Sequence, residues 1–259
     1  MALQTVAGNQ ATANRGQPDR LERAVSQLPE DQRRILRVLS VIFEPVNQTT
    51  LQKVLTALDW RDRRGAPLTA LVAGALRAQW VDAGLIDFQQ NALSCHPDLR
   101  ESLTRETVAD GSFQTIVAAV EQVVPSRETR AWLSESDARP QRLLRNALYT
   151  GYPTGDEAQA LELMRMATST PLSQLRAVEV KRLTEICTRP LDAAWLEGLG
   201  PRLRALALVP WLREAALDLD QSTDAYALME QVLSPLVETD PDCADALAEQ
   251  RLLHGRLDD

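Results

Sequence analysis

The segment from residue 67 to residue 105 changes its hydrophobic periodicity twice, and this change limits the folds that are open to the chain. Apolar side chains recur at helical spacing over residues 67–80 and then fall in two short extended runs over residues 85–95. A polar tight turn separates the two runs, and Pro97 opens another helical stretch. The segment is therefore predicted to fold as a helix, a β-hairpin and a helix.

Two further helices are expected before this segment. The first begins at Pro29, which suits the first helical position, and carries apolar residues at helical spacing. The second follows Asn47, whose side chain is a good helix cap, and buries the apolar positions of residues 51–58. Three helices, a hairpin and a helix are the element order of a winged helix, which we place at residues 19–110. Residues 1–18 are small and polar without an apolar period, so we expect an unstructured tail there.

The chain beyond residue 111 is expected to be entirely helical, because its turn signals all separate helical patterns and no strand pattern follows Cys95. Short connections favour antiparallel neighbours, and paired helices of this kind favour an α-solenoid. The predicted fold class is therefore mostly α: a winged helix with one small β-hairpin, followed by a helical-repeat array at residues 111–259. The expected helices cover residues 113–124, 140–149, 156–167, 171–187, 191–199, 203–219, 224–236 and 241–253.

Charge is spread unevenly along the chain, whose formal net charge is -8. Residues 17–110 carry 12 basic and 13 acidic side chains, whereas residues 111–259 carry 15 basic and 23 acidic side chains. An acidic helical half repels a phosphate backbone, whose attraction for proteins depends on Lys and Arg. Any contact with nucleic acid is therefore expected in the first half.

The cysteines and the hydropathy pattern of the sequence favour a cytoplasmic location. Cys95, Cys187 and Cys243 are far apart and odd in number, so no disulfide framework is implied and a reducing cytoplasm is favoured. No apolar run approaches the length of a membrane span, and the N-terminus lacks a signal-peptide core. We expect a soluble protein that does not contact a membrane.

The segment from Leu28 to Arg105 carries LPEDQRRILRVLSVIFEPV at one end and DAGLI and CHPDLRE at the other. It resembles the winged-helix domains of bacterial signal-transducing NTPases and the N-terminal region of large bacterial SWI/SNF-type helicase-like proteins. In those NTPases a stretch like HxxLRE follows the wing, and His96 matches its histidine. The chain contains neither a phosphate-binding glycine loop nor helicase motifs, so the nucleotide chemistry of those families is not expected here.

The last stretch, TDPDCADALAEQRLLHGRLDD, has an Ala-rich packing pattern and a closing turn at GRLDD. It resembles the first helix of a tetratricopeptide repeat. A repeat helix cannot bury its inner face alone. We therefore expect either a fragment of a longer protein or a docking surface that another chain completes.

The third helix and the loop before it hold the candidate contacts with nucleic acid or with a partner protein. A DNA-binding winged helix places its third helix in the major groove, where base readout and phosphate binding require several cations or amides. The outward face of this helix carries a single Arg, and Asp59 and Asp62 interrupt the arginines before it. We therefore favour a solvated charged loop and a helix face that packs on protein. The candidate residues are Arg61, Arg63, Arg64, Thr69, Ala73 and Arg77.

No catalytic, metal or cofactor site is expected. His96 has only Cys95 beside it, and adjacent strand residues point to opposite faces, so a structural role is favoured. The sequence has no nucleophile elbow, and its two histidines lie in unrelated segments, so an enzyme is not expected. The carboxylates of the helical array are interpreted as solvated faces, with an acidic concave surface for a basic partner segment as the alternative.

The function favoured by the sequence is non-catalytic protein–protein interaction. The chain would act as an adaptor, either as the N-terminal part or as a subunit of a larger bacterial assembly. The alternative is a DNA-binding transcriptional or helicase-associated regulator that uses the winged helix.

Overall fold

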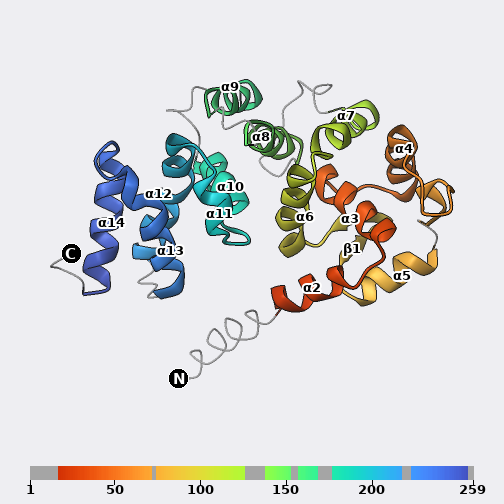
Figure 1. The fold of residues 1–259 in the computed structure, drawn as a ribbon, viewed down its shortest axis with the longest axis horizontal. Coiled ribbons are helices and arrows are strands. Elements are labelled where there is room, and N and C mark those ends of the chain that lie inside the picture. The colour runs from red at the N-terminus through yellow and green to blue at the C-terminus, as the bar shows by residue number, and fades with distance from the viewer. Residues whose placement is uncertain are drawn as a thin grey trace. The chain divides into compact units, whose positions relative to one another are not determined.

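The computed structural model describes residues 17–71, 74–125, 138–152, 157–168, 177–217 and 223–255. Within these residues the chain is mostly helical, and its strands form one antiparallel hairpin. The predicted mostly α composition with a small hairpin is therefore confirmed. The chain divides into two compact units, Met1–Glu128 and Thr129–Asp259, whose elements run from red to blue in Figure 1.

None of the helices in the described ranges combines the length and the apolar character that crossing a lipid bilayer requires.

The central helix of the first unit is α3 (Glu30–Ile42). From Ile35 to Ile42 every side chain except that of Arg37 is buried. The reason is that α3 packs against four elements: α4 (Gln48–Leu58), α6 (Pro97–Ala109), α7 (Phe113–Val123) and β2 (Ala92–Cys95). A helix surrounded in this way requires apolar side chains on nearly all sides instead of on a single stripe. It ends at Phe43, whose φ is 69°. The expected first helix is thus the core of the unit.

The second expected helix is α4 (Gln48–Leu58). The predicted cap at its start is present: the Asn47 side chain accepts a hydrogen bond from the backbone N–H of Thr50 at 2.8 Å. The four apolar positions that face the core, Leu51, Val54, Leu55 and Leu58, are buried.

The sequence does not predict α2 (Gln17–Ser26), whose first two residues fall within the expected tail of residues 1–18. Leu21 and Val25, one helical turn apart, are buried, and α2 packs against α6. Two apolar positions are too few to show a helical period, so the packing against α6 accounts for this helix. The remaining residues of the expected tail lie outside the described residues.

The expected third helix has two parts, η1 (Leu68–Leu71) and α5 (Gly74–Asp82). The α-helix therefore does not begin at Pro67, because a 3-10 helix follows that residue. The chain is held in an extended conformation before η1, because Pro67 forms an isolated bridge with Arg61 and the Leu68 N–H donates to the Trp60 carbonyl at 3.0 Å. Such contacts cannot form within a helical turn.

The hairpin of β1 (Ile86–Gln89) and β2 (Ala92–Cys95) follows α5, with Ile86 opposite Cys95 and Gln89 opposite Ala92. The two turn residues, Gln90 and Asn91, have φ of 50° and 64°. Positive φ at both positions defines a type I′ turn, whose twist matches that of the strands. On its other edge β2 exchanges two hydrogen bonds with Val46, of 2.7 and 2.9 Å.

The first unit extends past the boundary at residue 110 that the sequence suggests. After α6 (Pro97–Ala109), the chain forms α7 (Phe113–Val123), which we expected to open the helical array. Phe113, Ile116, Ala119 and Val120 are buried, and α7 packs against α3, α4 and α6. The physical reason for the later boundary is this apolar face, which completes the core of the first unit.

Where the structure describes them, the helices of the second unit agree closely with the expected segments, and residues 156, 171–176 and 218–219 of those segments lie outside the described residues. The bounds are α8 (Ala138–Gly151), α9 (Glu157–Thr168), α10 (Ala177–Thr188), α11 (Ala193–Glu197), α12 (Pro201–Leu217), α13 (Thr223–Leu233), η3 (Ser234–Leu236) and α14 (Pro241–Leu253). Among the described residues of this unit, α8 packs against α9 and α10, α10 against α12, and α12 against α14, while α11 packs against α13.

The middle of α12 contains Pro210, whose nitrogen has no hydrogen and cannot donate to the carbonyl of the preceding turn. In that turn, the buried hydroxyl of Thr184 on α10 donates to the Ala207 carbonyl at 2.7 Å. Gln250 on α14 likewise donates its side-chain amide to the Leu212 carbonyl at 2.7 Å. These two side chains tie α10 and α14 to the backbone of α12.

Candidate functional site

The loop from Asp59 to Pro67 joins α4 to η1 and is closed by its own hydrogen bonds. One carboxylate oxygen of Asp62 accepts from the backbone N–H groups of Arg64 and Ala66, each at 2.8 Å. The Asp62 N–H donates to the Ala66 carbonyl at 2.7 Å, and the Gly65 N–H donates to the Asp62 carbonyl at 3.0 Å. Asp side chains stabilise turns in this way. The loop therefore has a defined conformation.

Arg61, the first candidate residue, turns back onto this loop. One terminal nitrogen lies 3.2 Å from the Asp59 carboxylate, and the other donates to the Gly65 carbonyl at 3.2 Å. The charge of Arg61 is therefore paired within the loop.

Arg63 and Arg64 are both exposed. Within the part of the chain that the structure describes, neither side chain takes part in an ion pair or a hydrogen bond. The reason lies in the two acidic residues nearby, since Asp59 is paired with Arg61 and Asp62 accepts from backbone N–H groups. Asp59 and Asp62 therefore form no ion pair with these two guanidinium groups.

The candidate residues of the third helix lie in different settings. Thr69 is half-buried in η1, and Ala73 lies outside the described residues. Arg77 stacks over the ring of Phe88 in β1, with 4.6 Å between the guanidinium carbon and the ring centroid. This cation–π contact links α5 to the hairpin. The structure thus places Arg61, Arg63 and Arg64 in one loop and Arg77 in a contact between helix and hairpin.

Where the structure describes the burial of α5, the exposed residues are Ala78, Gln79, Val81 and Asp82, and Val81 is 39% exposed. The candidate residue Arg77 is half-buried. Where the structure describes the side chains of α5, the exposed ones are apolar, amide and acidic, and none is a cation.

Arg34 and Trp60 form a contact that the sequence does not predict. The guanidinium of Arg34 on α3 lies 4.2 Å from the Trp60 ring centroid and donates to the Arg61 carbonyl at 3.4 Å. Arg34 thereby connects the central helix to the start of the loop. The two residues are far apart in the sequence, so no local pattern could have indicated this contact.

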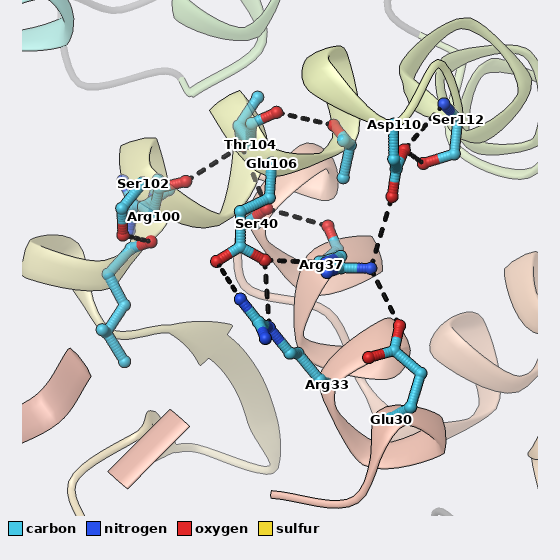
Figure 2. Close-up of polar contacts among 12 residues, drawn as sticks. Glu30, Arg33, Arg37, Ser40, Arg100, Ser102, Thr104, Glu106, Asp110 and Ser112 are labelled. Atoms are coloured by element: carbon cyan, nitrogen blue, oxygen red, sulfur yellow. Dashed lines mark hydrogen bonds and ion pairs between the residues drawn. The ribbon is translucent and has the colours of Figure 1, made fainter. Parts of the chain in front are cut away.

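A second cluster of charges joins α3 to α6, as Figure 2 shows. The carboxylate of Glu106 accepts from Arg33 at 2.6 and 3.1 Å and from Arg37 at 2.9 Å. Arg37 also contacts Glu30 at 3.0 Å and Asp110 at 3.3 Å. The hydrogen bond to Glu106 raises the pKa of Arg33 above its ordinary value. Both arginines are therefore engaged by carboxylates.

This α3–α6 cluster could have been suspected from spacing. Arg33 and Arg37 are four residues apart on one helix, and Glu106 and Asp110 are four residues apart on and just after another, so each pair shares a face. The sequence does not show that the two faces meet. Their contact depends on the packing of α3 against α6, beside which the hydroxyls of Ser40 and Thr104 lie 3.0 Å apart.

His96 is the N-cap of α6, where its Nδ1 accepts from the backbone N–H of Asp98 at 3.3 Å. This contact is a structural role of the kind expected for His96. Cys95, next to it on β2, is buried. Across the described ranges, no group of three or more His, Cys, Asp and Glu residues is arranged to hold a metal ion.

Some carboxylates of the second unit also have structural contacts. Glu157, which the sequence places on a solvated face, accepts from the Leu203 N–H at 2.8 Å at the start of α12. A Cβ at Gly200 would lie 2.4 Å from the Glu157 carboxyl carbon, so this close approach requires glycine. Glu162 pairs with Arg165 on the exposed side of α9. Glu157 is thus a helix cap.

A scan against protein-family models, a search of curated proteins and a search of solved structures each gave no match.

Proposed function

We propose that this protein is a non-catalytic adaptor that binds a partner protein through a winged helix in its first unit. The order of α3, α4, the third helix and the hairpin supports this fold, and so does the pairing of Val46 with β2, which adds a third strand position. In the second unit, the contacts of α10 with α12 and of α12 with α14 support a helical-repeat array.

The observation that carries this proposal is the nature of the surface around the third helix. In the described part of α5 the exposed residues include Val81 and Asp82 and no cation, and Arg77 is stacked on Phe88. DNA-binding helices instead present Arg, Lys, Asn or Gln toward the bases, with further cations on the phosphates. A mixed apolar and polar surface of this kind suits contact with protein.

DNA binding is the alternative, and the exposed guanidinium groups of Arg63 and Arg64 favour it. The exposed amide of Gln79 is also chemically able to read adenine. Phosphate contacts supply most of the affinity for DNA, however, and each contributes about 0.9 to the slope of log affinity against log salt. Two such cations would give a slope of only about 2, against roughly 10 for a strong DNA-binding protein.

We further propose that the protein works in a reducing cytoplasm as part of a larger bacterial assembly. Within the described residues no disulfide joins Cys95, Cys187 and Cys243, and all three are buried, which suits a compartment without disulfide formation.

Site-specific photo-crosslinking in the source cells tests the proposed function. A benzophenone amino acid replaces Arg64 or Gln79, which are both exposed and belong to the proposed surface. The control position is Glu22 on α2, which is exposed and lies outside that surface.

We expect a discrete protein adduct from positions 64 and 79 and none from position 22. The adduct should disappear when an excess of the unlabelled chain competes for the partner. Adducts with nucleic acid at position 64 or 79 would instead support the DNA-binding alternative, and equal yields of protein adduct at all three positions would contradict a specific interaction surface.

A further inference from the structure

The loop from Asp59 to Pro67 presents two neighbouring cations on a defined backbone. Asp62 organises the turn from inside, through its hydrogen bonds to the N–H groups of Arg64 and Ala66. The bridge between Arg61 and Pro67 closes the loop at its base. A loop that is already ordered loses little conformational entropy when its side chains bind a partner. Arg63 and Arg64 are therefore well placed for recognition.

We infer that Arg63 and Arg64 bind a segment of the partner protein that is rich in Glu or Asp. This inference rests on the proposed function and names the chemical class of the partner. A guanidinium presents a planar pair of N–H donors that matches a carboxylate, so two adjacent arginines can bind two acidic side chains. The carboxylates of the loop do not use the donors of Arg63 and Arg64, because Asp59 is paired with Arg61 and Asp62 accepts from backbone N–H groups.

The surroundings of the loop favour an acidic protein segment over a nucleic acid. The third helix, which would have to approach a duplex, exposes Asp82 and no cation in its described part. The Asp59 side chain is 78% exposed and paired with Arg61, so this pair adds no net positive charge for an extended phosphate backbone. A short acidic segment can pair with Arg63 and Arg64 without covering these residues.

Fluorescence anisotropy on the purified full chain tests this inference. The probe is a labelled peptide rich in glutamate, and a glutamine-rich peptide of the same length and a labelled DNA duplex are measured beside it. Titrations run between about 50 and 200 mM salt, because contacts between exposed charges weaken as salt rises. The test variant is Arg63→Ala with Arg64→Ala. The matched control is Arg20→Ala with Arg202→Ala, which removes two other exposed arginines.

We expect the chain to bind the glutamate peptide more tightly than the glutamine peptide. The Arg63→Ala and Arg64→Ala double variant should weaken binding by about two- to thirtyfold, the range for two exposed charge pairs, while the control should bind as wild type does. In the wild-type chain, amide NMR signals of Arg63 and Arg64 should shift on addition of the glutamate peptide and those of Arg20 should not. The NMR measurement needs no variant to fold.

Three results would overturn the inference. These are equal affinity for the two peptides, loss of affinity that is no greater in the test variant than in the control, and duplex binding that is tighter than peptide binding and depends on Arg63 and Arg64. If specific protein adducts still form at positions 64 and 79 in cells, the proposed function survives and only the acidic character of the partner is wrong.

Discussion

Individual polar side chains in the second unit satisfy backbone groups of neighbouring helices. Such bonds matter where a backbone group is buried, because leaving it without a partner costs free energy. Arg204, for example, donates to the carbonyls of Glu197, Leu199 and Val232 at 2.9 to 3.1 Å, near the ends of α11 and α13. One guanidinium therefore holds two helix ends.

Replacing Thr184 with Val should lower the free energy of unfolding by about 0.5 to 1.5 kcal/mol, because Val has the same shape but cannot make the buried hydrogen bond to the Ala207 carbonyl. Urea denaturation followed by circular dichroism measures this change. The matched control is Thr188→Val, whose hydroxyl donates only to the carbonyl of Thr184 on its own helix. The control should change stability by less than about 0.5 kcal/mol, and equal losses would show that the bond to Ala207 has no special role.

Cys243 should react slowly with iodoacetamide. Burial, together with the negative charges of Asp240 and Asp242, raises the pKa of its thiol from 9.0 to about 11. The thiolate is the reactive form, so at pH 8 the folded chain should be alkylated at this position about a hundredfold more slowly than the unfolded chain. Mass spectrometry of the peptide that contains Cys243 measures both rates. Similar rates in the two states would contradict the raised pKa.

The same pKa predicts a loss of stability in alkali. Between about pH 9 and pH 11 the unfolded chain releases the Cys243 proton while the folded chain retains it, so the free energy of unfolding falls as the pH rises. The Cys243→Ala variant lacks this titration. The difference in stability between wild type and variant should therefore shift against wild type over this range, and a difference that is constant with pH would exclude the effect.

Pairs of helices in the first unit are joined by polar as well as apolar contacts. The α3–α6 cluster places one carboxylate, Glu106, between two guanidinium groups, and Arg37 reaches two further carboxylates. Because Arg37 is 14% exposed and Arg33 and Glu106 are each 30% exposed, the attraction among these three side chains is stronger than that of fully exposed pairs. The cluster fixes how α6 lies on the central helix.

Replacing Glu106 with Gln should lower the free energy of unfolding by about 1 to 2 kcal/mol, since three charge-assisted hydrogen bonds are weakened in a site where the Glu106 side chain is 30% exposed. Glu162→Gln is the control, because Glu162 also binds one arginine through both oxygens but both side chains are 53% exposed. We expect a clearly smaller loss in the control, because water screens an exposed pair. Chemical denaturation compares the two, and similar losses would contradict a role for burial.

At the scale of the whole molecule, the two units differ in charge and composition. The acidic excess lies mainly in the C-terminal part of the chain, while the first unit is nearly balanced and uses many of its cations internally. Cations that are paired within the fold contribute little to the attraction of phosphates. This pairing is why we predict a protein partner instead of a nucleic acid.

Local patterns were enough to predict most of the elements. The cap at Asn47, the start of α6 at Pro97 and the two-residue turn at Gln90-Asn91 each follow from the chemistry of neighbouring residues. The helical segments of the second unit follow from apolar periodicity and turn residues. The sequence also located the charged loop. It could not show that Arg61 is paired with Asp59, while Arg63 and Arg64 have no ion pair among the described residues.

The sequence alone determined the mostly helical class, the position of the hairpin and the location of the charged loop, because these depend on residues a few positions apart. Only the tertiary structure decided that α2 is a helix, that α7 belongs to the first unit and which side of α5 is exposed. It also decided that Asp59 and Asp62 are engaged within the loop, while Arg63 and Arg64 have no ion pair among the described residues. The physical reason is that these outcomes depend on contacts between distant segments and on hydrogen-bond geometry, which residue order does not specify.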